Sequence, residues 1–177
     1  MKLNANPSRE NLENLRLLYE EAFPADEKKP FALMLQKREE GSMEFLTVEE
    51  DGGEFLGLVI MILHKGIALL DYFAISPEKR GGGIGSRILE ELKERYDGKR
   101  LLLEIEDPDE PADNTPERLR RRGFYQRNGM EIMNYKVWLF GVKMLVLTHG
   151  GKVSFEEYHE IFDAVFSPAA GKNVTKV

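Results

Sequence analysis

The residues whose types and spacing point most directly to chemistry lie in the segment "EKRGGGIGSRILEEL", residues 78–92. Four glycines occupy five positions directly before an amphipathic run, although glycine is a poor helix former. Because glycine places no side chain in front of its N–H, such a segment lets an anion approach backbone donors at the first turn of a helix. Arg80 adds a positive charge, and Ser86 adds a hydroxyl. The residues themselves leave two interpretations open, an anion-binding loop or a flexible linker before an ordinary helix.

The segment departs from both common nucleotide-phosphate fingerprints. A P-loop ends in Gly-Lys-Ser/Thr, but here a serine and an arginine follow Gly85. A dinucleotide-binding fingerprint needs a third glycine at its sixth position. Counted from Gly81 or Gly83, that position holds a serine or an isoleucine. The pattern therefore excludes an ATP-type P-loop and disfavours a dinucleotide-binding fold.

Composition narrows the class of protein further. The chain has 177 residues, 42% hydrophobic and 32% charged, which is typical of one globular domain rather than a disordered chain. The net charge of −6 argues against a nucleic-acid partner. The absence of cysteine excludes a thiolate nucleophile, and the three histidines are too scattered in the sequence to predict a metal site.

The beginning of the chain and its apolar runs predict a location. The first 15 residues contain no apolar signal core, and the longest apolar run, residues 55–63, is too short to span a bilayer. We expect a cytoplasmic protein with no membrane partner.

The elements that must position these residues follow from hydrophobic periodicity and capping signals. Helices are predicted at 8–23, 31–41, from the glycine segment through 92, at 115–129 and at 154–166; strands at 43–50, 55–64, 67–76, 100–106, 130–140 and 142–151. Ser8 and Thr115 are predicted N-caps, and Ser154 with Glu157 forms a capping box. The order predicts one α/β domain over 1–177, with a central parallel strand–helix–strand unit between antiparallel hairpins and a loose tail at 167–177.

Three sequence segments resemble a known superfamily. "RGGGIG" (80–85) matches the Arg/Gln-x-x-Gly-x-Gly/Ala motif of the GNAT acetyltransferases. The segment "YFAISPEKRGGGIGSRILEEL" is similar to that superfamily's strand 4, phosphate loop and helix, "LLLEIE" to its strand 5, and "FYQRNGM" to the Tyr-containing segment that follows. The resemblance covers residues 67–130. It implies a GNAT-like, mixed, mostly antiparallel central sheet flanked by helices.

The resemblance implies a cofactor and the residues that bind it. The cofactor is acetyl-CoA, whose pyrophosphate would lie on the backbone N–H groups of the glycine loop, with Ser86 assisting. That loop comprises Arg80, Gly81, Gly82, Gly83, Ile84 and Gly85. The pantetheine arm would pair with backbone groups of Phe73, Ala74 and Ile75 at the end of strand 4. Arg127 or Arg121 would lie near the CoA phosphates.

The resemblance also implies direct acetyl transfer to an amine, which needs no nucleophilic residue. Tyr125 falls on the family's tyrosine position and would protonate the departing thiolate. Glu104, followed by Asp71, is the candidate for the base that takes the amine proton. Without the family, Tyr125 would be interpreted as a packed aromatic, and the acids as solvated or salt-bridged residues at a sheet edge.

Two features depart from the family's pattern. The family's asparagine seven residues before the tyrosine is Arg118 here, and "DPDEPADN" (107–114) lengthens the link from strand 5. Asn114 is a substitute candidate for the missing asparagine, and the acidic loop could fold near the acceptor site. The arginines around Arg118 are interpreted as a solvated helix face rather than a nucleic-acid patch.

The sequence does not identify the amine that would accept the acetyl group. Glu20, Glu21, Asp26 and Glu27 lie between the first two helices, in the region that forms the acceptor wall in the superfamily, but such a charge run is usually just solvated. A small-molecule amine, a polyamine, a peptide N-terminus and a lysine are all compatible with the sequence, as are a monomer and a homodimer. The alternatives are a transferase for another acyl-CoA and a CoA-binding sensor module without turnover.

Overall fold

The computed structural model describes residues 1–25 and 27–177, so Asp26, one of the acids named above, lies outside the described residues. The described chain divides into two compact units. The first comprises Met1–Leu63 and Leu70–Arg95, and the second comprises His64–Leu69 and Tyr96–Val177.

The first unit is built on antiparallel strands with long apolar runs. Strand β2 (Met43–Glu49) pairs with β1 (Lys2–Asn4) on one side and with β3 (Phe55–His64) on the other, and β4 (Ile67–Ile75) follows β3 in the sheet. Seven consecutive residues of β3, Leu56–Ile62, are buried, as expected of a strand covered on both faces.

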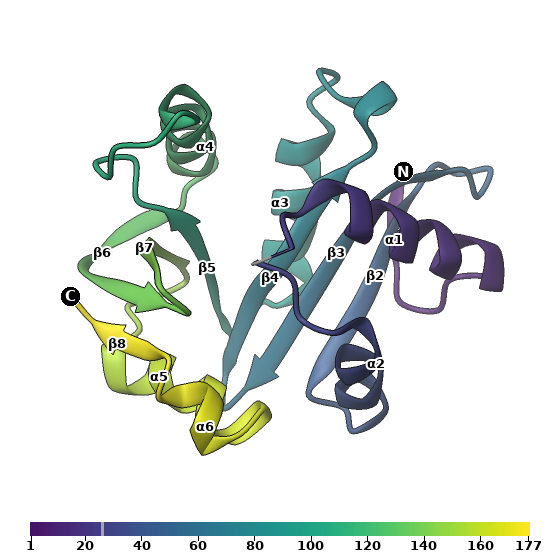
Figure 1. Ribbon diagram of the computed structural model, residues 1–177. Helices are drawn as coiled ribbons and strands as arrows, with labels where there is room; N and C mark the ends of the chain where they lie inside the picture. Colours follow the sequence, from purple (N-terminus) through teal and green to yellow (C-terminus); the bar gives the residue numbers. More distant parts are fainter. Residues whose placement is uncertain (26) are drawn as a thin grey trace. The chain divides into compact units, whose positions relative to one another are not determined.

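Helices cover both faces of this sheet (Figure 1). The helices α1 (Arg9–Ala22) and α2 (Phe31–Glu39) lie over one face, and α3 (Ile84–Arg95) lies over the other. Helices α1 and α3 bury apolar stripes, and α3, for example, buries Ile88, Leu89 and Leu92. Helix α2 buries only Met34. The predicted cap of α1 is confirmed, because the Ser8 hydroxyl accepts a hydrogen bond from the Asn11 N–H at 3.0 Å.

The second unit contains the strands β5 (Arg100–Glu106), β6 (Glu131–Leu139), β7 (Val142–His149) and β8 (Val174–Lys176). Strand β7 pairs antiparallel with β5 and β6, and β8 pairs antiparallel with β6. The helices are α4 (Thr115–Arg127), α5 (Phe155–Val165) and α6 (Pro168–Gly171). Helix α5 begins with the predicted capping box of Ser154 and Glu157.

The predicted fold class is confirmed. The strands belong to a mixed, mostly antiparallel sheet flanked by helices. Within each unit the assigned strand pairs are antiparallel. None of the described helices combines the length and apolar character needed to cross a bilayer.

Two local predictions are corrected by the structure, and two short elements were not predicted. Thr115 is not the cap of α4: Asn114 occupies that position without a side-chain cap bond, and the Thr115 hydroxyl donates to the Ala112 carbonyl at 2.6 Å instead. The tail at 167–177 is not loose, because it forms α6 and β8. The strand β1 and the 3-10 turn Pro77–Lys79 were not predicted; both are too short to carry a periodic pattern.

Candidate active site

The glycine loop joins β4 to α3 within the first unit. Gly81 and Gly83 have φ angles of +91° and +73°, which other residues rarely adopt. A Cβ atom added at residue 81, 82 or 83 would meet no atom within 4 Å, so the backbone is open at all three positions. The loop backbone is therefore free of covering side chains at these glycines, as the sequence predicted.

Backbone donors of this loop are available for a ligand. In the described part of the chain, the N–H groups of residues 81–86 donate no hydrogen bond, whereas the N–H of Arg87 bonds the Gly83 carbonyl at 3.2 Å as α3 begins. The Arg80 side chain turns back, and its Nε donates to the Ile75 carbonyl at 3.0 Å. Free donors at a helix N-terminus attract anions, and the Arg80 bond anchors the loop to the end of β4.

A close backbone contact positions the end of β4. A Cβ at Gly57 on β3 would lie 2.5 Å from the Ala74 carbonyl oxygen and 2.9 Å from Ile75 Cδ1. Only glycine therefore lets β3 lie this close to β4. The predicted pantetheine-binding residues Phe73, Ala74 and Ile75 are all half-buried.

Asp71, two residues earlier on β4, is one of the two candidate bases. Its Oδ1 accepts a hydrogen bond from Lys29 Nζ at 2.7 Å, and its Oδ2 is buried without a hydrogen-bond partner among the described residues. Lys29 belongs to the segment between α1 and α2. No local pattern predicts this pair, because its members are 42 positions apart in the chain.

Glu104, the other candidate base, lies on β5 in the second unit. Its Oε1 accepts a hydrogen bond of 2.8 Å from the hydroxyl of Tyr158, a fully buried residue of α5. Glu106, two residues further along β5, instead forms ion pairs with Arg118 at 2.6 Å and Arg121 at 3.2 Å. The interpretation of Arg118 as part of a solvated face is therefore wrong, because both partners of its ion pair are nearly buried.

Tyr125 lies on α4 in the second unit and is 9% exposed. Burial raises the pKa of the Tyr125 phenol to about 12, although the positive charge of Arg121 acts to lower it. Phe124 packs against the Tyr125 ring edge to face, with ring centroids 5.1 Å apart. Tyr125 thus stays a protonated hydrogen-bond donor throughout the neutral pH range.

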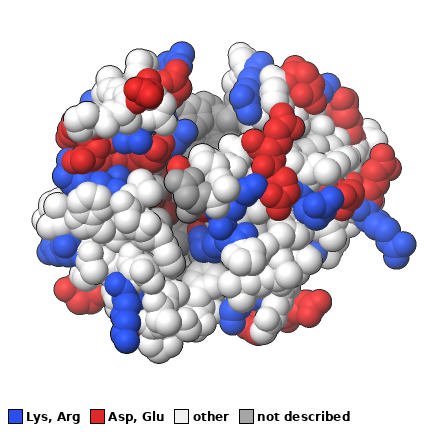
Figure 2. Space-filling model, viewed as in Figure 1, with Lys and Arg blue, Asp and Glu red and all other residues white. Residues whose placement is uncertain are grey.

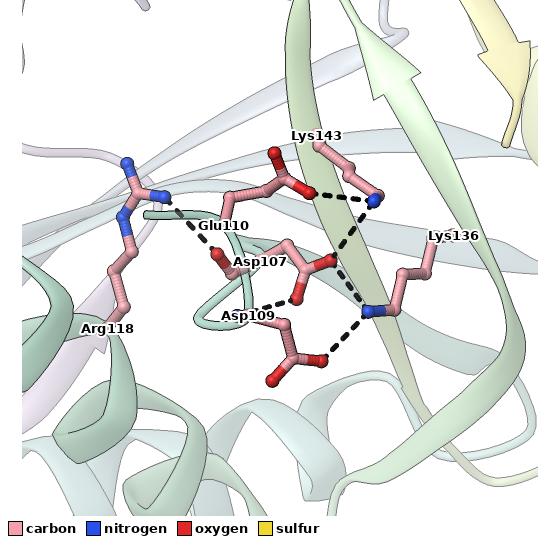
Figure 3. A network of polar contacts seen from close by, with 6 residues as sticks. All are labelled: Asp107, Asp109, Glu110, Arg118, Lys136 and Lys143. Atoms are coloured by element: carbon pink, nitrogen blue, oxygen red, sulfur yellow. Dashed lines mark hydrogen bonds and ion pairs between the residues drawn. The ribbon is translucent and has the colours of Figure 1, made fainter. Parts of the chain in front are cut away.

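The acidic loop 107–114 is held by lysines on β6 and β7 (Figure 3). Asp107 is fully buried and accepts a hydrogen bond from Lys136 at 2.7 Å; Lys136 also bonds Asp109, and Lys143 bonds Glu110 at 2.8 Å. Burial alone would raise the pKa of Asp107, but the bonds from Lys136 and the Asp109 N–H outweigh it and hold that pKa below its usual range. These carboxylates are therefore neutralised within the second unit. Figure 2 shows acidic and basic side chains next to one another on the face of the molecule that it displays.

The remaining sequence candidates occupy more ordinary positions. Arg127 is exposed and folds back toward Gly123 of its own helix. Asn114 Nδ2 lies 3.5 Å from Glu106, at the limit of a hydrogen bond. Among the described residues, no three His, Cys, Asp or Glu side chains lie close enough to hold a metal ion.

A hollow of about 490 Å³ lies in the first unit between α1, the β2–β3 turn and residues 76–78. None of the predicted site residues lines it. Its rim carries Glu10, Glu21, Glu54 and Glu78, so Glu21, an acid named from the sequence, lies at this hollow.

Comparison with known proteins assigns the family. The profile described as an acetyltransferase (GNAT) domain matches residues 41–131, about half of the chain. The Bacillus subtilis protein named "Putative acetyltransferase YjbC" is 33% identical over 107 residues, which cover 60% of this chain and 51% of that relative. The chain thus spans about half the length of this curated relative. This protein belongs to the GNAT acetyltransferase family.

Solved structures of GNAT proteins share the fold. A Bacteroides thetaiotaomicron structure named "Putative acetyltransferase from GNAT family" aligns with 94% of this chain and 99% of its own, with a TM-score of 0.78 and 21% identity. The Vibrio cholerae spermidine N-acetyltransferase in complex with CoA and spermine aligns with 84% of this chain and 94% of its own, with a TM-score of 0.60 and 16% identity. At these identities the likeness establishes the fold. Acetyltransferases of this family use acetyl-CoA.

Proposed function

We propose that this protein is an N-acetyltransferase that moves the acetyl group of acetyl-CoA directly to a primary amine. The observation that carries the proposal is the open glycine loop between β4 and α3, with free N–H donors at the start of a helix, in a chain of the GNAT family. The acceptor is a small-molecule or peptide amine. Polyamines belong on the panel of candidates because a structural neighbour is named for spermidine.

The glycine loop supplies the anion site. The N–H groups of residues 81–86 would hold the pyrophosphate of CoA, and the Ser86 hydroxyl would add a further donor. The backbone of Phe73–Ile75 would pair with the extended pantetheine arm. Arg80 already bonds the Ile75 carbonyl, so its role is to fix the loop against β4 while its charge favours the anion.

The transfer needs one proton to leave the amine and one to reach the sulfur. The amine lone pair forms the new N–C bond, the C–S bond breaks with its electrons going to sulfur, and one proton passes overall from nitrogen to the thiol. Glu104 is our candidate for the group that takes the amine proton, because the Tyr158 hydroxyl holds its carboxylate in one orientation.

Tyr125 would stabilise the departing thiolate. With a pKa of about 12, its phenol is a weaker acid than a thiol with a pKa of about 8.5. Full proton transfer from Tyr125 to the thiolate is therefore uphill by about 5 kcal/mol. Tyr125 acts best as a hydrogen-bond donor to the developing negative charge, with solvent completing the protonation.

A thiol-release assay with acetyl-CoA and an amine panel tests this proposal. We expect turnover on at least one amine, stoichiometric formation of the acetylamide, and loss of most of the rate in Tyr125→Phe. Tight CoA binding without turnover on any amine would favour the sensor alternative. A higher kcat/KM with propionyl-CoA or succinyl-CoA than with acetyl-CoA would favour transfer of another acyl group.

A further inference from the structure

The ion pair between Lys29 and Asp71 places a fixed cation on one of the candidate catalytic carboxylates. Lys29 Nζ lies 2.7 Å from Asp71 Oδ1, and the side chains are 20% and 7% exposed. Asp71 Oδ2 is buried, and no described residue donates a hydrogen bond to it. A buried carboxylate oxygen without a donor is costly, so this atom is the natural place for an N–H of a ligand.

The position of Lys29 is set by its backbone as well as by its charge. The Lys29 N–H donates to the Tyr72 hydroxyl at 3.1 Å, and the Lys29 carbonyl accepts from the Tyr19 hydroxyl at 2.9 Å. Lys29 Nζ also lies 5.0 Å from the centroid of the Tyr72 ring, within the range of a cation–π contact. Because both tyrosines are buried, the lysine is held at Asp71 rather than swinging freely at the surface.

Asp71 lies on the strand along which the pantetheine arm of the cofactor is expected to bind. Strand alternation places Asp71, Phe73 and Ile75 on one side of β4. Asp71 is four residues before Ile75, about 13 Å of extended strand away from the glycine-loop end. An acyl arm that follows Phe73–Ile75 away from the loop would therefore bring its reacting end toward Asp71.

We infer that the Lys29–Asp71 pair makes this enzyme selective for weakly basic amines, such as the α-amino group of a peptide, over strongly basic alkyl amines such as lysine side chains and polyamines. The inference rests on the proposed acetyl transfer. A lone Asp71 carboxylate would attract an ammonium ion. With Lys29 bound to it, the pair has no net charge and no longer attracts an ammonium ion, while Asp71 Oδ2 still accepts an N–H from a neutral amine.

The acid–base properties of amines make this distinction large. An α-amino group has a pKa of about 7.7–8.0, and a lysine side chain has a pKa of about 10.4. At pH 7.5 the neutral fraction of an α-amine exceeds that of an alkyl amine by about two orders of magnitude. A site that cannot stabilise the ammonium form gains nothing from the abundant charged form of an alkyl amine.

The other ionisable groups around the pair leave this balance in place. Glu20 on α1 and Lys28 in the segment between α1 and α2 pair with each other at 2.6 Å. Tyr19 from α1 and Tyr72 from β4 face the pair, and burial raises the pKa of the Tyr19 phenol well above its usual range.

Two matched amines test the inference: alanine amide, which offers only an α-amine, and Nα-acetyl-lysine amide, which offers only an ε-amine. At pH 7.5 we expect kcat/KM of the wild-type protein to favour alanine amide at least 100-fold. We expect Lys29→Gln to reduce this ratio at least tenfold, chiefly through a lower KM for the ε-amine. Lys28→Gln is the matched control and should keep the wild-type ratio.

Two further measurements test the inference without relying on whether the Lys29→Gln variant folds. The double variant Asp71→Asn with Lys29→Met removes both charges and should keep a ratio within threefold of wild type. For the wild-type protein alone, kcat/KM at pH 7.5 should fall with rising amine pKa across a series of 2-substituted ethylamines of similar size, whose electron-withdrawing substituents set the amine pKa. If the wild type preferred the ε-amine, or if folded Lys29→Gln kept the wild-type ratio, the inference about selectivity would be wrong. The proposed acetyl transfer would still stand. The absence of transfer to any amine would remove the proposed function and this inference with it.

Discussion

The hydroxyl of Tyr158 on α5 donates a hydrogen bond of 2.8 Å to Glu104 on β5. The two residues are 54 positions apart, and Tyr158 is fully buried. A residue of the last long helix thus orients the carboxylate for which we propose a role in proton transfer. The bond constrains the side chain on a rigid strand, which is how catalytic groups are usually held in place.

Replacement of Tyr158 by phenylalanine should therefore affect the rate as well as stability. We expect a loss of about 1–2 kcal/mol in the free energy of unfolding and a fall in kcat of about tenfold, against about 10²–10³-fold for Glu104→Gln. The matched control is Tyr135→Phe, which removes a buried hydroxyl bonded to the Val153 carbonyl at 3.0 Å in the same unit. It should lower stability by a similar amount and leave kcat unchanged. Equal kcat in both tyrosine variants would mean that Tyr158 has only a structural role.

The raised pKa of Tyr125 predicts an alkaline effect on stability. Because burial raises this pKa from about 10 in the unfolded chain to about 12 in the fold, the folded state disfavours the phenolate. The stabilising contribution is complete below pH 10 and is lost as the pH rises toward 12. In urea unfolding measured at several pH values, Tyr125→Phe should lose stability less steeply than wild type above pH 10, by about 1.4 kcal/mol per pH unit. Identical slopes would show that the phenol is not buried in solution.

Gly83→Asp should weaken CoA binding at least tenfold, because it adds a side chain and a negative charge at the proposed pyrophosphate site. Gly83→Ala separates the side chain from the charge and should have the smaller effect. Gly98→Asp is the control, since Gly98 also has a positive φ (+81°) and open space in front of it but lies outside the loop. If calorimetry gave the same Kd for Gly83→Asp and Gly98→Asp, the placement of the pyrophosphate would be wrong.

Gly57→Ala should damage cofactor binding from a neighbouring strand. The added methyl group would lie 2.5 Å from the Ala74 carbonyl oxygen, so the end of β4 must shift, at a cost of about 1–3 kcal/mol in stability. We expect KM for acetyl-CoA to rise severalfold in the folded variant. Gly52→Ala, in the nearby β2–β3 turn with no atom within 4 Å of the added carbon, should change neither KM nor stability appreciably. An unaltered KM in Gly57→Ala would argue against cofactor pairing with Phe73–Ile75.

Local patterns predicted most elements, because capping and periodicity act over a few residues. Ser8 and the Ser154–Glu157 box mark helix starts correctly. The prediction of Thr115 as an N-cap is wrong, and the Thr115 hydroxyl donates a hydrogen bond to the Ala112 carbonyl. The last strand was missed because its three residues gain stability only by pairing with β6.

The family, the fold class and the position of the glycine loop follow from the amino-acid sequence, because they depend on motifs and periodicities that are local in the chain. The partner of each carboxylate follows only from the folded arrangement: Asp71 binds Lys29, Glu104 binds Tyr158, and Glu106 binds Arg118. The difference arises because these partners lie far apart along the chain. A charge or hydrogen-bond partner that arrives from another element leaves no mark in the local pattern, yet it decides whether a carboxylate is neutralised, oriented or buried.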